Sequence, residues 1–414
     1  MSPDQRVSTI GDAHVSKRRI DRPTHEKRII RALFAAGLTT FASMYSAQAL
    51  LPSFSAAFGA TPAQSALAVS LTTGCLALAI IPVSALASRI GRTRVMIWSS
   101  ITATVLGLLL PFCPSLQVLL AVRALQGIAL AGVPAVAMAY LAEEIGAAGL
   151  GAAMGVYIAG NTIGGLAGRL IPALTLEVAS WRWAEAAIAV AAATCTIWFI
   201  RDLPPSRGFV PRPAGLRTVA TDLVGQLRHP GLLALFGLAF VLMGGFVSVY
   251  NFLGYRLTRP PFELSSGIAG SIFVFYLAGT VTSTAAGHLA DRHGPPRVLT
   301  ASIVTMAVGI SLTIPDRLVT LLIGVLLYTA GFFAAHTVAS AWVGRLAENR
   351  GAASSLYLFA YYLGSALVGG STGLAFAAGG WLGLTLCVGA LLVVAVLLLC
   401  ALTHRNTTAE PVNG

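Results

Sequence analysis

Two stretches of this chain carry no charged residue, and each is too long for a single membrane crossing. They are residues 32–88 and 351–403. Because about 20 apolar residues cross the hydrocarbon core of a bilayer as a helix, each stretch predicts a pair of transmembrane helices. Pro52 and Pro62 bracket the turn expected in the first stretch, and the sequence AAGGW at 377–381 marks the turn expected in the second.

The composition indicates an integral membrane protein. Of the 414 residues, 56% are hydrophobic and 10% are charged, whereas soluble domains carry about 25% charged residues. The mean hydropathy is +0.80. A net charge of +12 would suggest nucleic acid as the partner of a soluble protein. Here the basic residues lie between apolar runs, so we expect the partner to be the lipid bilayer and expect no nucleic-acid binding.

The apolar runs together predict twelve spans in an all-α fold. The expected organisation is a polar tail at 1–30, a six-helix bundle at 31–200, a linker at 201–230, a second six-helix bundle at 231–403 and a C-terminal tail at 404–414. The N-terminal tail is expected to be disordered, because it is polar and mixed in charge. The expected spans are 31–52, 65–87, 95–112, 117–141, 147–171, 183–200, 231–254, 266–287, 297–314, 319–342, 351–376 and 382–402.

The distribution of basic residues predicts the orientation. With both termini inside, 21 Lys and Arg residues lie on the inner side and 5 on the outer side, and Arg123 alone lies inside a span. Inner loops of membrane proteins are enriched in Lys and Arg. We therefore expect both termini and the linker to be cytoplasmic. Arg169 belongs to the outer set in this count.

The two halves resemble each other in sequence. LASRIGRTRVM at 86–96 matches LADRHGPPRVL at 289–299, GAAMGVYIAGNTIGG at 151–165 matches GAASSLYLFAYYLGS at 351–365, and LAEE at 141–144 matches LAEN at 346–349. The offsets are 203, 200 and 205 residues. Repeated halves of a transporter enclose a site near the middle of the membrane, so we expect a cavity between two pseudo-symmetric bundles.

Two motifs give the chain a resemblance to the major facilitator superfamily over nearly its whole length. The fourth-span motif R-x-x-Q-G-x-x-x-A is present as Arg123, Gln126, Gly127 and Ala131. The loop motif G-x-L-A-D-R-x-G-R-[RK] falls on residues 84–93. The chain looks most like the twelve-helix drug–proton antiporters and arabinose-efflux-type permeases. That resemblance implies alternating access in a bacterial cytoplasmic membrane.

The loop motif departs from the family pattern and supplies the candidate gating residues. Ser84 and Ser88 replace the expected Gly and Asp, whereas the second copy keeps the acidic residue. The fifth-span antiporter motif lacks its proline, because Asn161 follows Gly160. This weakens the case for an antiporter relative to the broader class of transporters. The candidate gating residues are Ser88, Arg89, Arg92, Asp291 and Arg292.

Polar and aromatic residues inside the spans are the candidate solute contacts. Arg123 and Gln126 are one helical turn apart and share a face. Arg123 is either a cavity arginine that binds an anionic group or a structural arginine satisfied by backbone carbonyls. Aromatic and amide side chains suit the orientation of a small polar or amphipathic ligand, although a tyrosine can also simply pack in a core. The candidates are Tyr45, Gln48, Arg123, Gln126, Tyr250, Asn251 and His336, with Asn161, Tyr276, Tyr357 and Tyr361 as weaker ones.

His336 is the candidate for proton coupling. It is the one histidine within the core of a span, and an imidazole titrates near neutral pH. A structural histidine is the alternative. Glu185 is expected to be interfacial, near the outer end of the sixth span. The glycines Gly160, Gly164 and Gly168 have the spacing typical of close helix packing.

The missing motifs narrow the function. The chain has no phosphate-binding loop, no metal-ligand cluster and no nucleophile–base pair, so we expect no cofactor, no metal and no enzyme activity. We expect a monomeric secondary transporter that exports a small organic solute, drug-like or sugar-like, against proton entry. The alternatives are an importer or uniporter of a small metabolite, and a membrane receptor or scaffold that does not transport.

Overall fold

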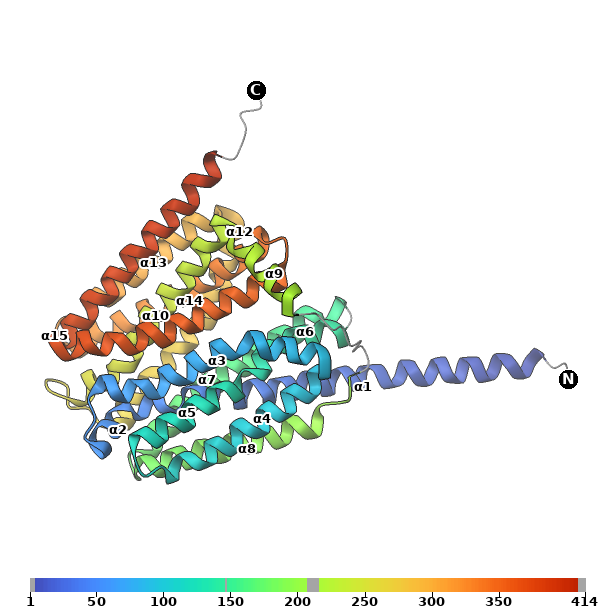
Figure 1. Cartoon of the computed structure of the whole chain (residues 1–414), viewed down its shortest axis with the longest axis horizontal. Helices are drawn as coiled ribbons and strands as arrows, with labels where there is room; N and C mark the ends of the chain where they lie inside the picture. The colour runs from blue at the N-terminus through green and yellow to red at the C-terminus, as the bar shows by residue number, and fades with distance from the viewer. Residues whose placement is uncertain (1–3, 146, 207–215, 409–414) are drawn as a thin grey trace.

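The computed structural model describes residues 4–145, 147–206 and 216–408, and this part of the chain is helical throughout apart from turns (Figure 1). The helices of the N-terminal half are α1 (Asp4–Tyr45), η1 (Ser46–Leu50), α2 (Leu51–Phe58), α3 (Pro62–Ile90), α4 (Arg92–Leu109), η2 (Leu110–Phe112), α5 (Leu116–Leu130), α6 (Gly132–Glu144), α7 (Ala147–Thr175) and α8 (Trp181–Asp202). Those that follow are α9 (Leu216–Leu227), α10 (Pro230–Thr258), α11 (Ser266–Ser271), η3 (Ile272–Phe275), α12 (Tyr276–His293), α13 (Pro295–Leu312), α14 (Leu318–Leu346) and α15 (Arg350–Thr408).

The helices make twelve spans, as the sequence predicts. Eleven helical segments of the described chain are long and apolar enough to cross a membrane. The last one covers 55 residues, from Arg350 to His404. Its backbone breaks at Gly379 and Gly380, where Gly380 has φ 58° and ψ −145°. This is a left-handed conformation that glycine adopts without a steric penalty, so the predicted turn at 377–381 divides α15 into two spans.

Three boundaries differ from the predictions. Helix α1 begins at Asp4, so the described part of the polar N-terminal segment is helical and not disordered. This segment continues the helix of the first span, and a helix that has already formed gains one hydrogen bond for each residue added. The linker contains a helix, α9. The first span continues to Phe58, because Pro52 occupies the first turn of α2, where its missing N–H costs nothing.

Close packing of the fifth and first spans confirms the prediction made from the fifth-span glycines. A Cβ atom on Gly160, Gly164 or Gly168 would overlap the backbone of α1 at Phe34, Leu38 and Ala42. The C-terminal half repeats this contact, because a Cβ on Gly364 would overlap the backbone of α10 at Phe240. Gly164 and Gly364 are matched residues of the predicted repeat, so the two halves share their packing as well as their sequence.

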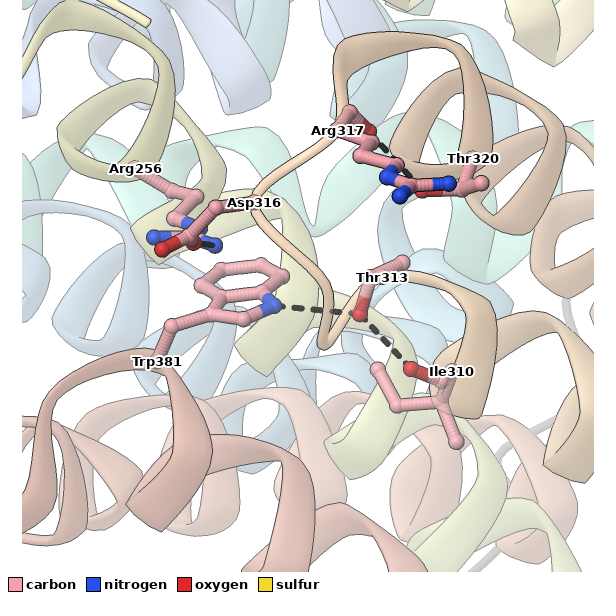
Figure 2. Close-up of polar contacts among 7 residues, drawn as sticks. All are labelled: Arg256, Ile310, Thr313, Asp316, Arg317, Thr320 and Trp381. Atoms are coloured by element: carbon pink, nitrogen blue, oxygen red, sulfur yellow. Dashed lines mark hydrogen bonds and ion pairs between the residues drawn. The ribbon is translucent and has the colours of Figure 1, made fainter. Parts of the chain in front are cut away.

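Polar contacts fix the turns of the C-terminal half at the end of the bundle opposite the termini (Figure 2). The Nε1 of Trp381, just after the break in α15, donates to Oγ1 of Thr313 at 3.0 Å. The hydroxyl of Thr313 in turn donates to the carbonyl of Ile310 at 2.7 Å. Arg256, near the end of α10, forms an ion pair with Asp316 in the turn between α13 and α14. These contacts tie three spans together where the halves meet.

The two halves join at that same end. Figure 1 shows α3 of the N-terminal half running beside the first part of α15, and these two helices are in contact. Ser365 donates to Thr73 at 3.3 Å between Oγ and Oγ1, and the hydroxyl of Tyr255 donates to the carbonyl of Leu51 at 2.7 Å. The backbone N–H of Gly267 donates to the carboxylate of Glu177. The described chain is thus in a conformation closed at the end opposite the termini.

Candidate transport site

Arg123 is enclosed by backbone carbonyls. Its guanidinium, on α5, is fully buried. Nε donates to the carbonyl of Ala68 at 3.1 Å, Nη1 to that of Ser43 at 2.9 Å, and Nη2 to that of Met44 at 2.8 Å. In this conformation the arginine joins α5 to α1 and α3 and does not face open water, contrary to the prediction of a cavity-facing side chain. A role in transport stays a prediction.

Gln126 and Glu185 complete the surroundings of Arg123. The Oε1 of Gln126 accepts from Nη1 of Arg123 at 2.8 Å. The hydroxyl of Ser46 accepts from the same Nη1 at 3.2 Å and lies 3.3 Å from Oε2 of Glu185. The carboxylate of Glu185 is 1% exposed, so the prediction of an interfacial residue is wrong. Because Ser46 bridges the two charges, Glu185 offsets the charge of Arg123 inside the N-terminal half.

Gln48 and Asn251 meet across the two halves. The Nε2 of Gln48 donates to Oδ1 of Asn251 at 2.7 Å. Asn251 also donates to the carbonyl of Gly369 at 3.2 Å. Both amides are buried, and they are 203 residues apart, which is the offset of one of the repeat matches. The first and seventh spans therefore contribute equivalent positions to one contact, as their predicted comparable depth suggested.

Arg169 is the functional candidate that the sequence analysis missed. On α7, its side chain is 2% exposed. Nε donates to Oε1 of Gln48 at 2.6 Å, and Nη1 donates to the carbonyl of Gly165 at 2.6 Å. The guanidinium carbon lies 4.0 Å from the ring centroid of Tyr45 and 4.4 Å from that of Tyr276. The arginine is thus held between aromatic rings of the two halves.

Aromatic rings of the C-terminal half extend from Arg169 to His336. Tyr276 lies 5.7 Å from Phe333, and Phe333 lies 5.4 Å from Phe332, between ring centroids. Phe332 stacks on His336 at 6.0 Å with an interplanar angle of 10°. Tyr250 joins the same group, with its hydroxyl 2.6 Å from Oγ1 of Thr329. We call the rings of Tyr250, Tyr276, Phe332, Phe333, His336 and Tyr361 the aromatic wall.

His336 has one satisfied ring nitrogen. Nδ1 lies 3.0 Å from the hydroxyl of Tyr357, and the ring lies 4.7 Å from that of Tyr361. Among the described residues Nε2 has no hydrogen-bond partner. The side chain is partly exposed. The predicted proton-coupling residue therefore lies in the aromatic wall, and its role in proton coupling stays a prediction.

Asn161 lies apart from this group. It belongs to α7, and its buried Oδ1 has no hydrogen-bond partner in the described part of the chain. A Cβ added to Gly37 of α1 would lie 2.5 Å from that oxygen. Asn161 therefore occupies the contact between the first and fifth spans. A contact with solute stays a prediction for this residue.

Among the described residues, no group of three His, Cys, Asp or Glu side chains could hold a metal ion. What the arrangement offers is non-covalent binding. It combines buried arginine, amide and hydroxyl groups with a wall of aromatic rings.

Comparison with known proteins decides the family. The model of the Major Facilitator Superfamily matches residues 33–275 and 260–414. The chain belongs to the major facilitator superfamily. The MFS-type transporter YybF of Bacillus subtilis is 40% identical over 371 residues, covering 89% of this chain and 92% of that one. The inner membrane transport protein YnfM of Escherichia coli is 40% identical over 379 residues, 91% of each chain. The protein is thus a membrane transporter of this type.

Solved structures of major facilitator proteins share the fold. A bacterial homologue of the human lysosomal transporter Spinster, in an inward-facing and occupied conformation, has a TM-score of 0.76 at 16% identity and covers 93% of this chain. The nucleoside transporter NupG has a TM-score of 0.75 at 14% identity and covers 91%. At these identities the likeness extends to the fold alone.

The loop residues of this major facilitator transporter form ion pairs within each half. Nε of Arg92, at the start of α4, donates to Glu143 at 2.7 Å. In the other half Nη2 of Arg345 lies 2.7 Å from Oδ1 of Asp291. In this conformation Asp291 is therefore paired with α14 of its own half.

The remaining loop candidates make no contact between the halves in the described chain. The hydroxyl of Ser88 donates to the carbonyl of Ala85 at 2.7 Å. Arg89 and Arg292 are exposed. A gating role for all five loop residues stays a prediction, which a conformation closed at the other end would test.

Proposed function

We propose that this transporter exports a small organic solute in exchange for protons, as a monomer in the bacterial cytoplasmic membrane with both termini inside. The observation that carries the proposal is the site itself. The halves close over buried polar groups at one end, and a partly exposed histidine lies in the adjoining wall. A binding site reached from one side at a time is what alternating access requires.

The orientation rests on the charges of the loops. The excess of Lys and Arg on the side of the termini favours a cytoplasmic location for that side. The conformation described here is then closed toward the outside. The name of the Escherichia coli relative, an inner membrane transport protein, supports the same membrane for this chain.

Proton coupling is proposed to use His336. An imidazole can bind and release a proton, whereas an arginine stays protonated. The hydrogen bond to Tyr357 orients the ring, and Nε2 faces away from that partner. Protonation at this position would place a positive charge in the aromatic wall that carries the solute.

The test compares gradient-driven transport with solute counterflow in the same everted vesicles. In the wild-type protein, addition of a transported solute should be accompanied by proton movement. We expect His336→Gln to keep counterflow, because the fold and the solute contacts remain, and to lose the dependence of transport on the pH gradient. The matched control is His288→Gln, an exposed histidine of α12, which should keep both activities.

Two outcomes contradict the proposal. If His336→Gln retains both activities, the proton passes through another residue or the protein is a uniporter. If wild-type vesicles transport no solute and move no protons across a broad panel of solutes, the protein acts as a receptor or scaffold of the same fold.

A further inference from the structure

We infer that the solute is a small organic anion, a carboxylate on an aromatic or apolar body, and that Arg169 pairs with its charge. The inference rests on the proposed function, because it names the class of solute for the same site. Four observations carry it: the charges around the site, the unused donors, the rings and their exposure.

The buried charges do not balance. The described N-terminal half buries two arginines that are at most 2% exposed, Arg123 and Arg169, but the acidic group beside them is Glu185. That carboxylate is linked to Arg123 through Ser46. Arg169 has no carboxylate within ion-pair distance among the described residues. One positive charge is therefore left over, at a place where charge is costly unless it is paired.

The partners of Arg169 leave donors unused. Nε and Nη1 each donate one hydrogen bond, to Gln48 and to the carbonyl of Gly165. Nη2 has no hydrogen-bond partner in the described chain. The hydroxyl of Tyr276, whose ring lies under the guanidinium, is buried and also lacks a partner. A carboxylate is the group that accepts from several donors at once, and hydrogen bonds to a charged partner are the strong ones.

The rings around Arg169 favour an anion over a cation. Cations bind aromatic faces, but Arg169 already covers the faces of Tyr45 and Tyr276 at 4.0 and 4.4 Å. A cationic solute would meet a guanidinium instead of a free ring. The site therefore presents positive charge to its ligand.

The aromatic wall is the reason for inferring that the solute also has an aromatic or apolar part. Phe333, His336 and Tyr361 are partly exposed, whereas Phe332 behind them is 1% exposed. Flat partly exposed rings beside a buried cation suit a ligand with one charged end and one apolar end. The carboxylate end would reach Arg169 and the body would lie on the wall.

The experiment measures binding to the purified full-length protein by its thermal unfolding temperature, because a ligand of the folded state raises that temperature with concentration. The probes are benzoate, phenylacetate and indole-3-acetate, each with its own carboxamide, and benzylamine. We expect at least one carboxylate to bind about tenfold or more tightly than its carboxamide. No binding by any of the three, equal binding of the carboxamides, or preferential binding of benzylamine would overturn the inference.

Variants of Arg169 then test whether this arginine binds the carboxylate of the probe. Arg169→Gln should remove the preference for the carboxylate, whereas Arg169→Lys should keep the preference with weaker binding, since lysine keeps the charge but loses the planar fork. The matched control is Arg182→Gln, an arginine of α8 stacked on Trp181 at 4.4 Å and bonded to the carbonyls of Pro111 and Cys113. It should bind as the wild type does.

Failure of a variant to fold leaves the test intact. If Arg169→Gln is not recovered as folded protein, Arg169→Lys and the wild-type selectivity decide the question. The two proposals also fail separately. Carboxylate binding without transport in vesicles would contradict the exporter and keep the anion site. Proton-driven transport of a neutral solute without carboxylate binding would contradict the anion site and keep the exporter.

Discussion

At the scale of single residues, the two buried arginines show what a sequence motif can predict and what it cannot. Arg123 was found from the fourth-span motif, and of its two predicted interpretations the carbonyl-bonded one describes this conformation. Arg169 could not be found that way, because it lies near a predicted span end and was counted with the outer loops. Helix α7 continues to Thr175, and rings from α1 and α12 cover the side chain. Its environment is tertiary, and no local pattern encodes it.

The arrangement of Arg123 predicts a stability effect. We expect Arg123→Ala to reach the membrane but to lose both transport and thermal stability, because three carbonyls and the carboxylate of Glu185 lose their partner. Breaking a buried charge pair costs about 3–5 kcal/mol. The unfolding temperatures of the purified variants measure this. Adding Glu185→Gln should recover part of the loss, since it removes the unpaired charge.

A double-mutant cycle provides the control for that prediction. Additive effects of Arg123→Ala and Glu185→Gln would show that the two charges do not interact through Ser46. Full transport by Arg123→Ala would show that the arginine is needed neither for the fold nor for the cycle.

At the scale of helices, the sequence predicted spans well and their ends less well. Length and the absence of charge determine a span, so twelve crossings could be predicted. The end of the first span depends on finer features. Gly59 ends α2 with φ 61°, and Thr61 and Gln64 form a capping box at the start of α3. Pro52 suggested an earlier end, yet it lies in the first turn of α2, just after the short 3-10 helix that carries Gln48.

The glycines of the fifth span predict a contrast between two substitutions of one type. Gly164→Ala should lower the unfolding temperature, because its Cβ would overlap the backbone of α1 at Leu38. The matched control on the same helix is Gly155→Ala, where a Cβ meets no atom within 4 Å. That change should be neutral or stabilising by up to about 1 kcal/mol, since alanine is the better helix former. Equal effects of the two variants would contradict close packing of α1 and α7.

At the scale of the whole molecule, equivalent positions of the two pseudo-symmetric halves contact each other. The repeat predicted two similar halves, and the structure places Gln48 against Asn251, 203 residues along the chain. Which end of the bundle is closed could not be predicted, because one sequence serves every conformation of the cycle. The closed end is a property of one state, and it is there that the halves must part.

The last prediction tests that parting directly. Oγ1 of Thr73 and Oγ of Ser365 lie 3.3 Å apart across the two halves. Sulfur atoms in their place need to approach to about 2 Å to form a disulfide. In a chain whose five native cysteines are replaced by serine, oxidation of Thr73→Cys/Ser365→Cys should stop transport, and reduction should restore it, because the bond ties α3 of one half to α15 of the other. The control pair is Thr104→Cys/Thr196→Cys, which joins α4 to α8 within one half at 2.8 Å between the hydroxyl oxygens; its oxidation should leave transport unchanged. Thiol counting before and after oxidation verifies that each bond has formed. Transport that continues through a formed Thr73→Cys/Ser365→Cys bond would mean that the halves do not separate at this contact.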